Sequence, residues 1–337
     1  MRTLSTSAPA ASVAPPGPLA VLPVSIVVPL RTAHPRLDLG ERLAQMATHV
    51  AEVIVVDGSD PLVQDAHRAG WPPSIRLLPL ADDDRTPMGK VGSVLAGART
   101  AGHEVIVIAD DDVTWSRAQL ERALAVMANT DVVGLRPQNR YATPTWVARW
   151  DTARSLVQRA VGGDWPGTYV VRRSALLDGG YRGDVMFENL ELERTLEARG
   201  GSVVVDLGLV VDRDPPTPRH FLGQRVRQAY DELARPAHLA VELAIVPTVA
   251  MGGRRAAGAI ALGAVALAEV GRRRAGGREH FPATSALWAP VWVAERAVTS
   301  WLALGSRLLL GGVRYRDGRL RHAASSSRRL RQEMNRR

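Results

Sequence analysis

Residues 105–113 read VIVIADDDV, and this stretch decides the fold. It opens with four β-branched residues in a row, which predict a strand covered on both faces, as in a parallel sheet flanked by helices. Asp110, Asp111 and Asp112 follow at the C-terminal end of that strand, where open α/β sheets bind their ligands. Adjacent carboxylates repel one another, so the triplet favours a bound cation.

The acidic triplet predicts a site for a metal ion and a nucleotide. Hard carboxylate oxygens select Mg²⁺ or Mn²⁺, and these ions commonly bridge to a substrate diphosphate. Side chains alternate along an extended backbone, so Asp110 and Asp112 are expected on one face and Asp111 on the other. We therefore assign Asp110 and Asp112 to the metal and Asp110 also to the nucleotide, and we leave Asp111 open. The alternative for the triplet alone is a solvated acidic turn.

Length, charge and cysteine content limit the possible folds and metal sites. The chain has 337 residues, a net charge of +9 and no cysteine, which excludes disulfides and thiolate metal sites. Its length suits one large domain, or one domain with an appendage. Residues 1–20 are rich in Ala, Ser, Thr and Pro without the apolar core of a signal peptide, so we expect a disordered leader there.

Predicted strands and helices alternate around the triplet. Strands are expected at 24–30, 52–60, 76–80, 131–135 and within 162–173, and helices at 37–49, 91–100, 116–128 and 144–160. Ser116 is the candidate N-cap of the third helix. This alternation predicts a doubly wound α/β fold.

Two further motifs precede the triplet. Asp57 ends the second predicted strand, where its carboxylate can accept a hydrogen bond from a base or a ribose; the alternative is a turn-forming Asp-Gly pair. Gly89 and Lys90 begin a helix, and free backbone N–H groups beside a cation suit an anion. Residues 82–84, DDD, are interpreted as a solvated loop.

Four segments together, VSIVVPL (24–30), VIVVDGSD (53–60), GKVGSVLAGA (89–98) and VIVIADDDV, resemble the family 2 glycosyltransferases with the GT-A fold. The resemblance covers about residues 22–230. It implies that Asp57 contacts the nucleotide base and that Lys90 lies near the nucleotide. It also implies that Asp110 and Asp112 hold the metal-bound sugar nucleotide.

The resemblance extends to a glycine-containing turn at residues 162–173, GGDWPGTYVVRR. In the family such a turn lines the donor sugar, so Gly167 and Thr168 are candidate donor-binding residues. Asp164 and Trp165 precede the turn and are candidates for contact with the sugar.

Residues 187–192, FENLEL, stand where the family has a Glu-Asp motif whose Asp is usually the catalytic base. Asn189 occupies that position, and an amide cannot take up a proton at neutral pH. The base is then Glu188 or Glu191, which are neighbours at a helix start; we prefer Glu188 and keep Glu191 open. The alternative is a solvated acidic helix N-terminus.

Residues 224–228, QRVRQ, resemble the QxxRW motif of processive and lipid-directed members. Gln224 and Arg227 match, and Gln228 replaces the tryptophan. The resemblance implies that this helix caps the donor site and that Arg227 offsets charge on the departing diphosphate.

The composition changes after residue 236. Apolar runs at 237–253 and 256–270 are each shorter than the ~20 residues that cross a bilayer, and arginines flank every run. In a third run, 284–312, Arg296 and Arg307 share one face of an amphipathic helix that can lie in a membrane interface. We expect surface-lying helices or a re-entrant hairpin; the alternative is an ordinary helical subdomain. The Arg/Ser-rich tail, 313–337, is expected to bind anionic headgroups.

The sequence therefore predicts a GT-A domain at 21–235, membrane-associated helices at 236–312 and a basic tail. We expect an inverting, metal-dependent glycosyltransferase at the cytoplasmic face of the cell membrane, similar to ceramide glucosyltransferase-like members. Its donor would be a nucleotide-diphosphate sugar, with UDP favoured, and its acceptor a lipid or lipid-linked hydroxyl. No nucleic-acid partner is expected. The alternatives are a nucleotidyltransferase and a non-catalytic sugar-nucleotide-binding protein, which Asn189 keeps open.

Overall fold

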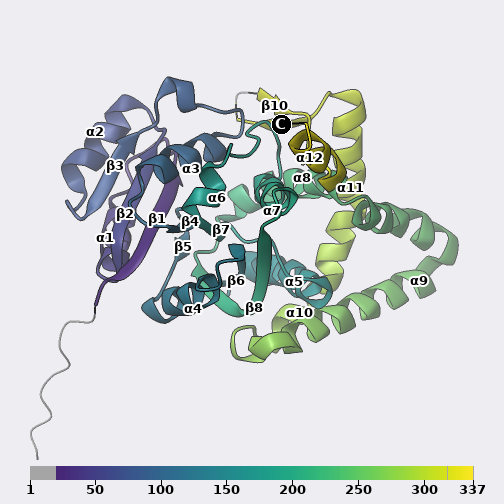
Figure 1. Cartoon of the computed structure of the whole chain (residues 1–337). Coiled ribbons are helices and arrows are strands. Elements are labelled where there is room, and N and C mark those ends of the chain that lie inside the picture. The colour runs from purple at the N-terminus through teal and green to yellow at the C-terminus, as the bar shows by residue number, and fades with distance from the viewer. Residues whose placement is uncertain (1–19, 317, 337) are drawn as a thin grey trace, which may run out of the picture.

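The computed structural model describes residues 20–316 and 318–336. The leader expected at 1–20 lies, except for its last residue, outside the described residues. An eight-stranded mixed sheet with the order β3-β2-β1-β4-β7-β6-β8-β5 forms the centre of the molecule (Figure 1). Its strands are β1 (Leu22–Leu30), β2 (Val50–Asp57), β3 (Ile75–Pro79), β4 (Val105–Ala109), β5 (Val113–Thr114), β6 (Val132–Tyr141), β7 (Thr168–Arg172) and β8 (Ser202–Arg213).

Strand β4 holds the VIVIA segment and lies between β1 and β7. It is parallel to β1, and β1, β2 and β3 are parallel to one another, as the alternation of strands and helices predicts. Residues 106–109 of β4 are at most 2% exposed. A β-branched run buried on both faces is what this segment predicts.

The far half of the sheet differs from a simple parallel pattern. Strand β7 is antiparallel to both β4 and β6, while β8 is parallel to β6. Strand β8 was not predicted. Only Leu209, Val210 and Val211 of its twelve residues are buried, and Asp206 and Gly208 interrupt its apolar run. A half-exposed strand gives a weak sequence pattern.

Helices cover both faces of the sheet. On one face α1 (Leu37–Ala47) and α4 (Arg117–Met127) pack on β1, β2 and β4, and α2 (Pro61–Gly70) lies beside α1. On the other face lie α3 (Gly89–Thr100), α6 (Arg173–Leu177) and α7 (Glu188–Ala198). Helix α4 begins with the predicted Ser116 cap, which forms a capping box with Gln119.

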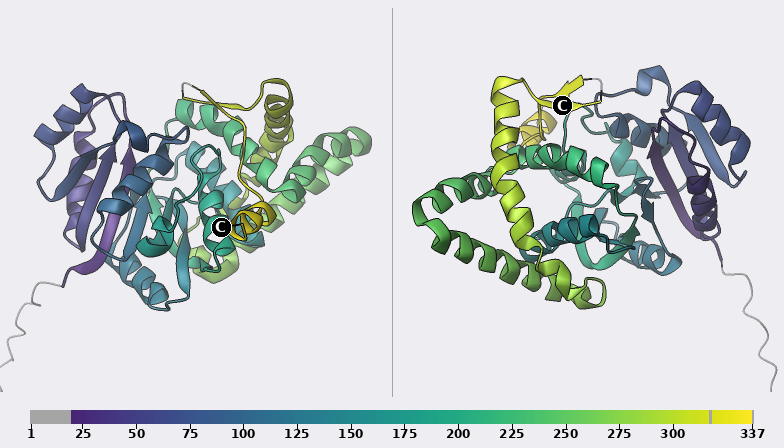
Figure 2. Two further views of the ribbon diagram at one scale, coloured as in Figure 1. Left: turned by 45° about the horizontal axis from the view of Figure 1, so that its top comes forward. Right: turned by 180° about the vertical axis from the view of Figure 1, so that it is seen from behind.

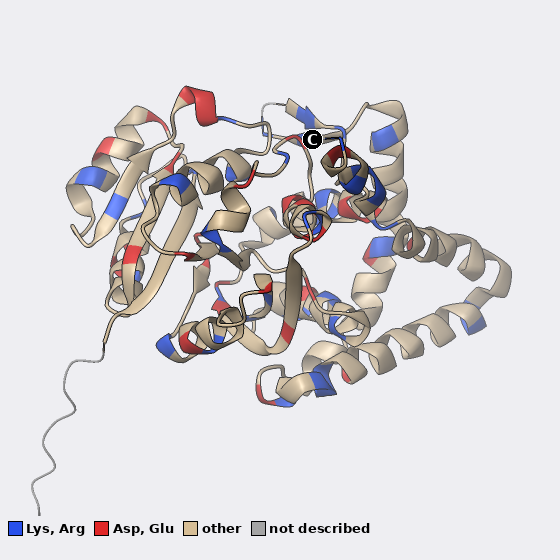
Figure 3. Cartoon of the chain, in the orientation of Figure 1, with Lys and Arg blue, Asp and Glu red and all other residues tan. Residues whose placement is uncertain are grey.

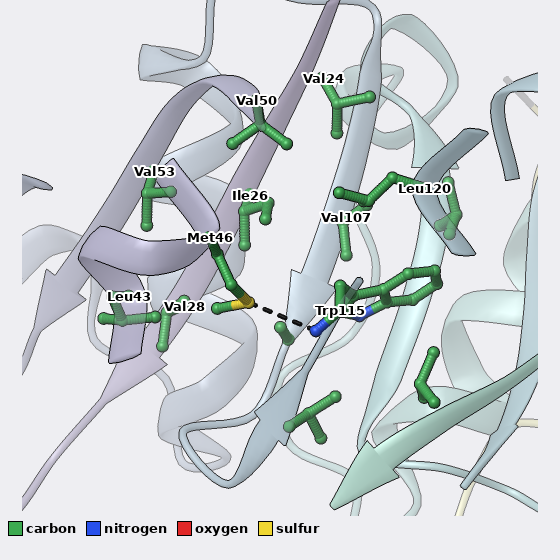
Figure 4. Packing of buried hydrophobic residues seen from close by; sticks show 14 of the residues in the cluster. Val24, Ile26, Val28, Leu43, Met46, Val50, Val53, Val107, Trp115 and Leu120 are labelled. Carbon is green, nitrogen blue, oxygen red and sulfur yellow. Dashed lines mark hydrogen bonds between the residues drawn. The ribbon is translucent and has the colours of Figure 1, made fainter. Parts of the chain in front are cut away.

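Trp115 fixes the segment that follows the acidic triplet. Its side chain is 1% exposed and packs in the core with Leu120 and Met46 (Figure 4). Its backbone N–H donates to Sδ of Met46 at 3.3 Å, and its indole Nε1 donates to Oγ1 of Thr168 at 3.1 Å. The triplet is therefore held between a buried strand and a buried tryptophan.

The C-terminal part is helical. It comprises α8 (Pro218–Tyr230), α9 (Pro236–Arg273), α10 (Ala283–Ala286) and α11 (Ala289–Leu309), with α5 (Trp146–Val161) packed against α9 and α11. Short 3₁₀ turns are η1 (Asp82–Asp84), η2 (Asp231–Ala234) and η3 (Arg274–Glu279). The tail forms the hairpin β9 (Val313–Tyr315) and β10 (Gly318–Leu320), followed by α12 (Ser327–Met334).

Helix α9 joins the two predicted apolar runs. Gly253, with φ 56° and ψ −144°, bends it into two limbs, which together with α11 frame a triangle (Figure 2). A residue other than glycine rarely adopts this φ. Among the described residues, one helix, 236–279, is long and apolar enough to cross a membrane, and 11% of its most apolar window is buried.

Helix α11 turns its polar face toward the protein. Arg296, Thr299 and Ser300 are buried, whereas Val298 and Leu302 are 58% and 53% exposed. An amphipathic helix with a polar and an apolar face was predicted here. The structure buries the polar face against the protein and exposes the apolar one. A helix on a water-facing surface has the reverse orientation.

Candidate active site

A cleft of about 430 Å³ opens at the carboxyl ends of β1 to β4, the edge that the sequence analysis selected. Its walls come from the strand ends, from the start of α3 and from the C-terminal hairpin. The lining residues are Pro29, Leu30, Arg31, Gly58, Leu80, Arg85, Thr86, Pro87, Gly89, Lys90, Ser93, Asp110, Asp111, Tyr315, Arg316, Gly318, Arg319 and Leu320.

Lys90 joins two carboxylates in this cleft. Its Nζ lies 2.7 Å from Oδ1 of Asp110 and 3.0 Å from Oε1 of Glu188. Burial opposes the charge of Lys90, but the two carboxylates outweigh it and raise its pKa. Lys90 is therefore a cation that holds Glu188 beside the first carboxylate of the triplet, although the two acids are far apart in sequence.

Gly167 permits the position of Asp110. The backbone N–H of Asp110 donates to the carbonyl oxygen of Gly167 at 3.0 Å. A Cβ added at Gly167 would lie 2.0 Å from Oδ2 of Asp110, a separation that real atoms do not show. Gly167 thus shapes the site through Asp110.

Thr168 does not reach the cleft. It is fully buried, donates from Oγ1 to the carbonyl oxygen of Ile108 at 2.6 Å and accepts from the Trp115 indole. Its predicted role toward a donor sugar is replaced by a structural one, joining β4 and β7. Asp164 is also internal, 2% exposed and 2.5 Å from Arg154, so it does not present its carboxylate to a sugar.

The triplet departs from the predicted alternation of faces. Asp110 and Asp111 both line the cleft, whereas Asp112 accepts from Nε of Arg213 on β8 at 2.8 Å. The strand ends at Ala109, and the N–H of Val113 bonds back to the carbonyl oxygen of Asp110 at 3.1 Å, so the triplet forms a turn. Alternation holds only for an extended backbone.

The carboxylates of the triplet have different electrostatic surroundings. Burial, followed by the charges of Asp112 and Asp110, raises the pKa of Asp111. Burial opposes the charge of Arg213, but Asp112, Tyr141 and Asp110 together outweigh it and raise the pKa of that guanidinium. One oxygen of Asp112, Oδ1, is buried and has no hydrogen-bond partner among the described residues.

The donor set suits a divalent ion that shares its shell with a substrate. No group of three or more His, Asp or Glu side chains in the described part of the chain is arranged to hold an ion alone. Mg²⁺ is usually bound through one or two carboxylates together with substrate phosphates. The carboxylate of Asp110 in the cleft and the unpartnered Oδ1 of Asp112, close to it in the chain, are candidate ligands of this kind. Burial, followed by the charges of Arg227 and Arg213, lowers the pKa of His220 on α8, and the charge of Asp112 opposes this shift.

Asp57 lies beneath the cleft surface. It is 2% exposed, its Oδ1 accepts from the backbone N–H of Ser59 at 2.9 Å, and its Oδ2 lies 2.7 Å from Nδ1 of His67. Both oxygens are engaged within the protein, so this side chain fixes the turn after β2. Within that turn, Gly58 lines the cleft.

The start of α7 separates the two candidate bases. Glu188 faces Lys90, while Glu191 is fully buried and accepts from the backbone N–H of Ser325 at 2.5 Å. Asn189 donates from Nδ2 to the carbonyl oxygen of Pro166 at 2.9 Å, which ties α7 to the glycine-containing turn. Of the two acids, Glu188 is the one that contacts a residue of the cleft, Lys90.

Helix α8 approaches the same region. The guanidinium of Arg227 lies 5.8 Å from the ring centre of Tyr315, which lines the cleft, and Gln224 hydrogen-bonds to His220. Arg225 points the other way and is 3.4 Å from Asp151. The predicted pair, Gln224 and Arg227, therefore lies on the side of α8 that includes His220 and faces the hairpin.

Sequence reasoning missed the contribution of the tail. Tyr315, Arg316 and Arg319 line the cleft although about 200 residues separate them from the triplet. The available signal was the arginine content of the tail, which was assigned to lipid headgroups. A run of charge does not reveal which anion it meets.

Comparisons with known proteins agree with this architecture. Residues 25–177 match the family model described as Glycosyl transferase family 2. Among solved structures, the mannosyltransferase PcManGT from Pyrobaculum calidifontis, in complex with GDP-Man and Mn²⁺, aligns with a TM-score of 0.52 and 20% identity over 85% of this chain and 89% of that one. A comparison with curated proteins found no match.

Two other solved structures align less well. Glucosyl-3-phosphoglycerate synthase from Mycobacterium tuberculosis, in complex with Mn²⁺ and UDP, has a TM-score of 0.41 and 17% identity over 61% of this chain and 77% of that one. Mannosyl-3-phosphoglycerate synthase from Rubrobacter xylanophilus has a TM-score of 0.42 and 15% identity over 64% and 74%. The predicted fold is confirmed: the chain has the GT-A fold, and residues 25–177 match the model of the family 2 glycosyltransferases.

Proposed function

We propose that this protein is an inverting glycosyltransferase that moves a sugar from a nucleoside-diphosphate sugar to an acceptor hydroxyl. One observation carries the proposal: Lys90, which lines a cleft at the carboxyl ends of parallel strands, pairs with both Asp110 and Glu188. A general-base candidate, Glu188, therefore lies beside a cleft that contains a candidate metal ligand, Asp110. The matched family and the GT-A fold support the same reaction class.

The chemistry follows from a direct displacement. The acceptor oxygen forms a bond to the anomeric carbon while the bond from that carbon to the diphosphate breaks, and the configuration inverts. Glu188 takes the proton of the acceptor hydroxyl. A divalent ion held by Asp110 or Asp112 would supply positive charge to the leaving diphosphate, and Arg227 would add to it.

We propose that the acceptor is a lipid or a lipid-linked hydroxyl presented at a membrane surface. Exposed apolar side chains on α9 and α11 support this, including Met251 at 84%, Leu262 at 74% and Leu302 at 53% exposed. An apolar cavity of about 530 Å³ lies between the limbs of α9, α5 and α11. Arg296 lines it, with Nε and Nη1 lacking hydrogen-bond partners among the described residues.

The charges on α9 favour a helix that lies on the membrane. Arg254 and Arg255 are exposed just after the bend, near the outer end of the two limbs (Figure 3). An inserted hairpin would carry both arginines to the greatest depth, where charge is most costly. A surface position leaves them among anionic headgroups and exposes the apolar side chains to the acyl boundary. The cytoplasmic face is proposed because its leaflet is the anionic one.

Calorimetric titration with UDP and GDP, with and without Mn²⁺, tests the donor site. Wild-type protein should bind at least one of them in a Mn²⁺-dependent manner, and Asp110→Asn and Asp112→Ala should each weaken that binding at least tenfold. Asp83→Asn, an exposed carboxylate on η1, is the matched control and should bind as wild type does. Equal affinity in the wild type and in both site variants would remove the metal assignment.

A further inference from the structure

The C-terminal hairpin forms one wall of the cleft. Strands β9 and β10 pair antiparallel, with Arg314 opposite Arg319 and Val313 opposite Leu320. The hairpin contributes Tyr315, Arg316, Gly318, Arg319 and Leu320 to the cleft lining. A segment expected to leave the catalytic domain therefore lies over its strand ends.

Anchors on both sides hold this hairpin in place. Buried Val313 and Leu320 pack in a cluster with Met88 and Val91 at the start of α3. After the hairpin, the backbone N–H of Met186 donates to the carbonyl oxygen of His322 at 2.8 Å.

The next anchors lie in α7 and α8. Ser325 donates its backbone N–H to Glu191, and Tyr230 donates its hydroxyl to the carbonyl oxygen of Arg321 at 2.6 Å. The tail is thus fixed to the segment that positions Glu188. These contacts make the hairpin part of the catalytic domain.

Two arginines of the hairpin bring charge to the cleft. Arg316 lies over the start of α3, since a Cβ added at Gly89 would be 2.8 Å from its Nη1. Arg319 donates to the carbonyl oxygen of Gly312 at 2.9 Å. Neither guanidinium forms an ion pair with a carboxylate within residues 20–316 and 318–336, whereas Lys90 beside them is engaged by two.

The backbone of Arg316 has an unusual conformation. Its φ of 50° is the left-handed conformation that residues other than glycine rarely adopt. Such conformations concentrate at ligand-binding sites, where the surrounding structure imposes them. Here the turn directs Tyr315, Arg316 and Arg319 to one cleft, with Arg227 also placed against the Tyr315 ring.

We propose that Arg316 and Arg319 bind the diphosphate of the sugar nucleotide, so that the C-terminal hairpin completes the donor site. The assignment rests on the proposed function, which supplies the diphosphate. A guanidinium presents paired N–H donors that match two phosphate oxygens, and such charge-assisted bonds are among the stronger ones in proteins. The positive end of the α3 helix dipole favours an anion at the same place.

Other arginines of the tail provide a matched control. Arg314 lies on the same hairpin, directly opposite Arg319, and is exposed without lining the cleft. Figure 3 shows further basic residues along α12. Arg314→Gln removes the same charge from the same hairpin, so it separates a specific contact from a general change in electrostatic potential.

The experiment uses the full chain with Mn²⁺ and measures calorimetric affinity for UDP and GDP and for the free nucleosides uridine and guanosine. Arg316→Gln and Arg319→Gln should each lose roughly tenfold in affinity for the diphosphate, with no change for the nucleoside. Arg314→Gln should stay within twofold of wild type. Hydrogen exchange should show that residues 313–320 gain protection when the diphosphate binds.

Three results would overturn the inference. Wild-type diphosphate affinity in both variants would remove the contact, and unchanged exchange at 313–320 would place the nucleotide elsewhere. If the two variants lose binding to phosphatidylglycerol vesicles but keep wild-type affinity for the nucleotide, the hairpin arginines bind lipid headgroups instead of the diphosphate. If the wild type binds no nucleoside diphosphate at all, the proposed function fails instead. Thermal unfolding of each variant verifies that the hairpin still packs.

Discussion

Glu188 and Glu191 lie one helical turn apart, yet the structure gives them different surroundings. Glu188 meets Lys90 in the cleft, and Glu191 is buried against the backbone of Ser325. Sequence spacing could narrow the choice to these two acids because Asn189 cannot accept a proton. It could not separate them, since the partner of Glu191 comes from the far end of the chain.

Replacement of the candidate base should separate chemistry from binding. Glu188→Gln preserves size and removes basicity, so we expect turnover to fall by ~10² to 10⁴ while donor affinity persists. Steady-state kinetics and donor titration measure the two effects. Glu191→Gln should retain turnover and lower the melting temperature, because it weakens the anchor of Ser325. Normal turnover in Glu188→Gln with an inactive Glu191→Gln would move the role to Glu191.

Gly167 offers a second test at a single position. Gly167→Ala would place a methyl group 2.0 Å from the present position of Oδ2 of Asp110, which must then move. We expect at least a tenfold loss of Mn²⁺-dependent nucleotide affinity from a protein that remains folded. Gly258→Ala on α9, where an added Cβ meets nothing within 4 Å, is the control. Equal nucleotide affinity in the two variants would show that Asp110 can shift without consequence.

Elements were predicted best where the pattern is local. Buried β-branched runs identified β1, β2 and β4, and the Ser116 cap identified the start of α4. The tail hairpin was missed because its packing depends on contacts with α3 and α8, which lie far from it in the sequence. The prediction that Asp110 and Asp112 share one face was wrong, because the backbone after β4 forms a turn and is not extended. That turn depends on hydrogen bonds made after the strand ends.

Helix α11 carries a prediction of its own. Its exposed apolar face should insert into a membrane interface, so Leu302→Gln should weaken flotation with anionic vesicles by about fivefold to tenfold, the scale expected for one leucine side chain. Leu62→Gln, on α2, removes a leucine of the sheet domain that is 84% exposed, more than Leu302 is, and should have no effect. Equal flotation of both variants and the wild type would make α9 and α11 an ordinary helical subdomain.

At the scale of the whole molecule, distant parts of the chain meet at one cleft. The ends of β1 to β4 supply its floor, α3 supplies Lys90, α7 supplies Glu188 beside it, and the hairpin near the C-terminus covers one side. The helices α9 and α11 lie beyond α5 and α8, on the side of the molecule away from strands β1 to β4 (Figure 1). Under the proposed function, this arrangement would place the donor in the cleft and the acceptor against the exposed apolar surface of α9 and α11.

Product analysis after incubation with UDP- and GDP-sugars, Mn²⁺ and a membrane lipid extract tests the central claim most directly. The account predicts that wild-type protein releases a nucleoside diphosphate and adds the mass of one sugar to a lipid, and that Glu188→Gln does neither while still binding the donor. Release of pyrophosphate from a nucleoside triphosphate would identify a nucleotidyltransferase. Donor binding without release of diphosphate in any mixture would contradict the account and favour a sugar-nucleotide-binding protein.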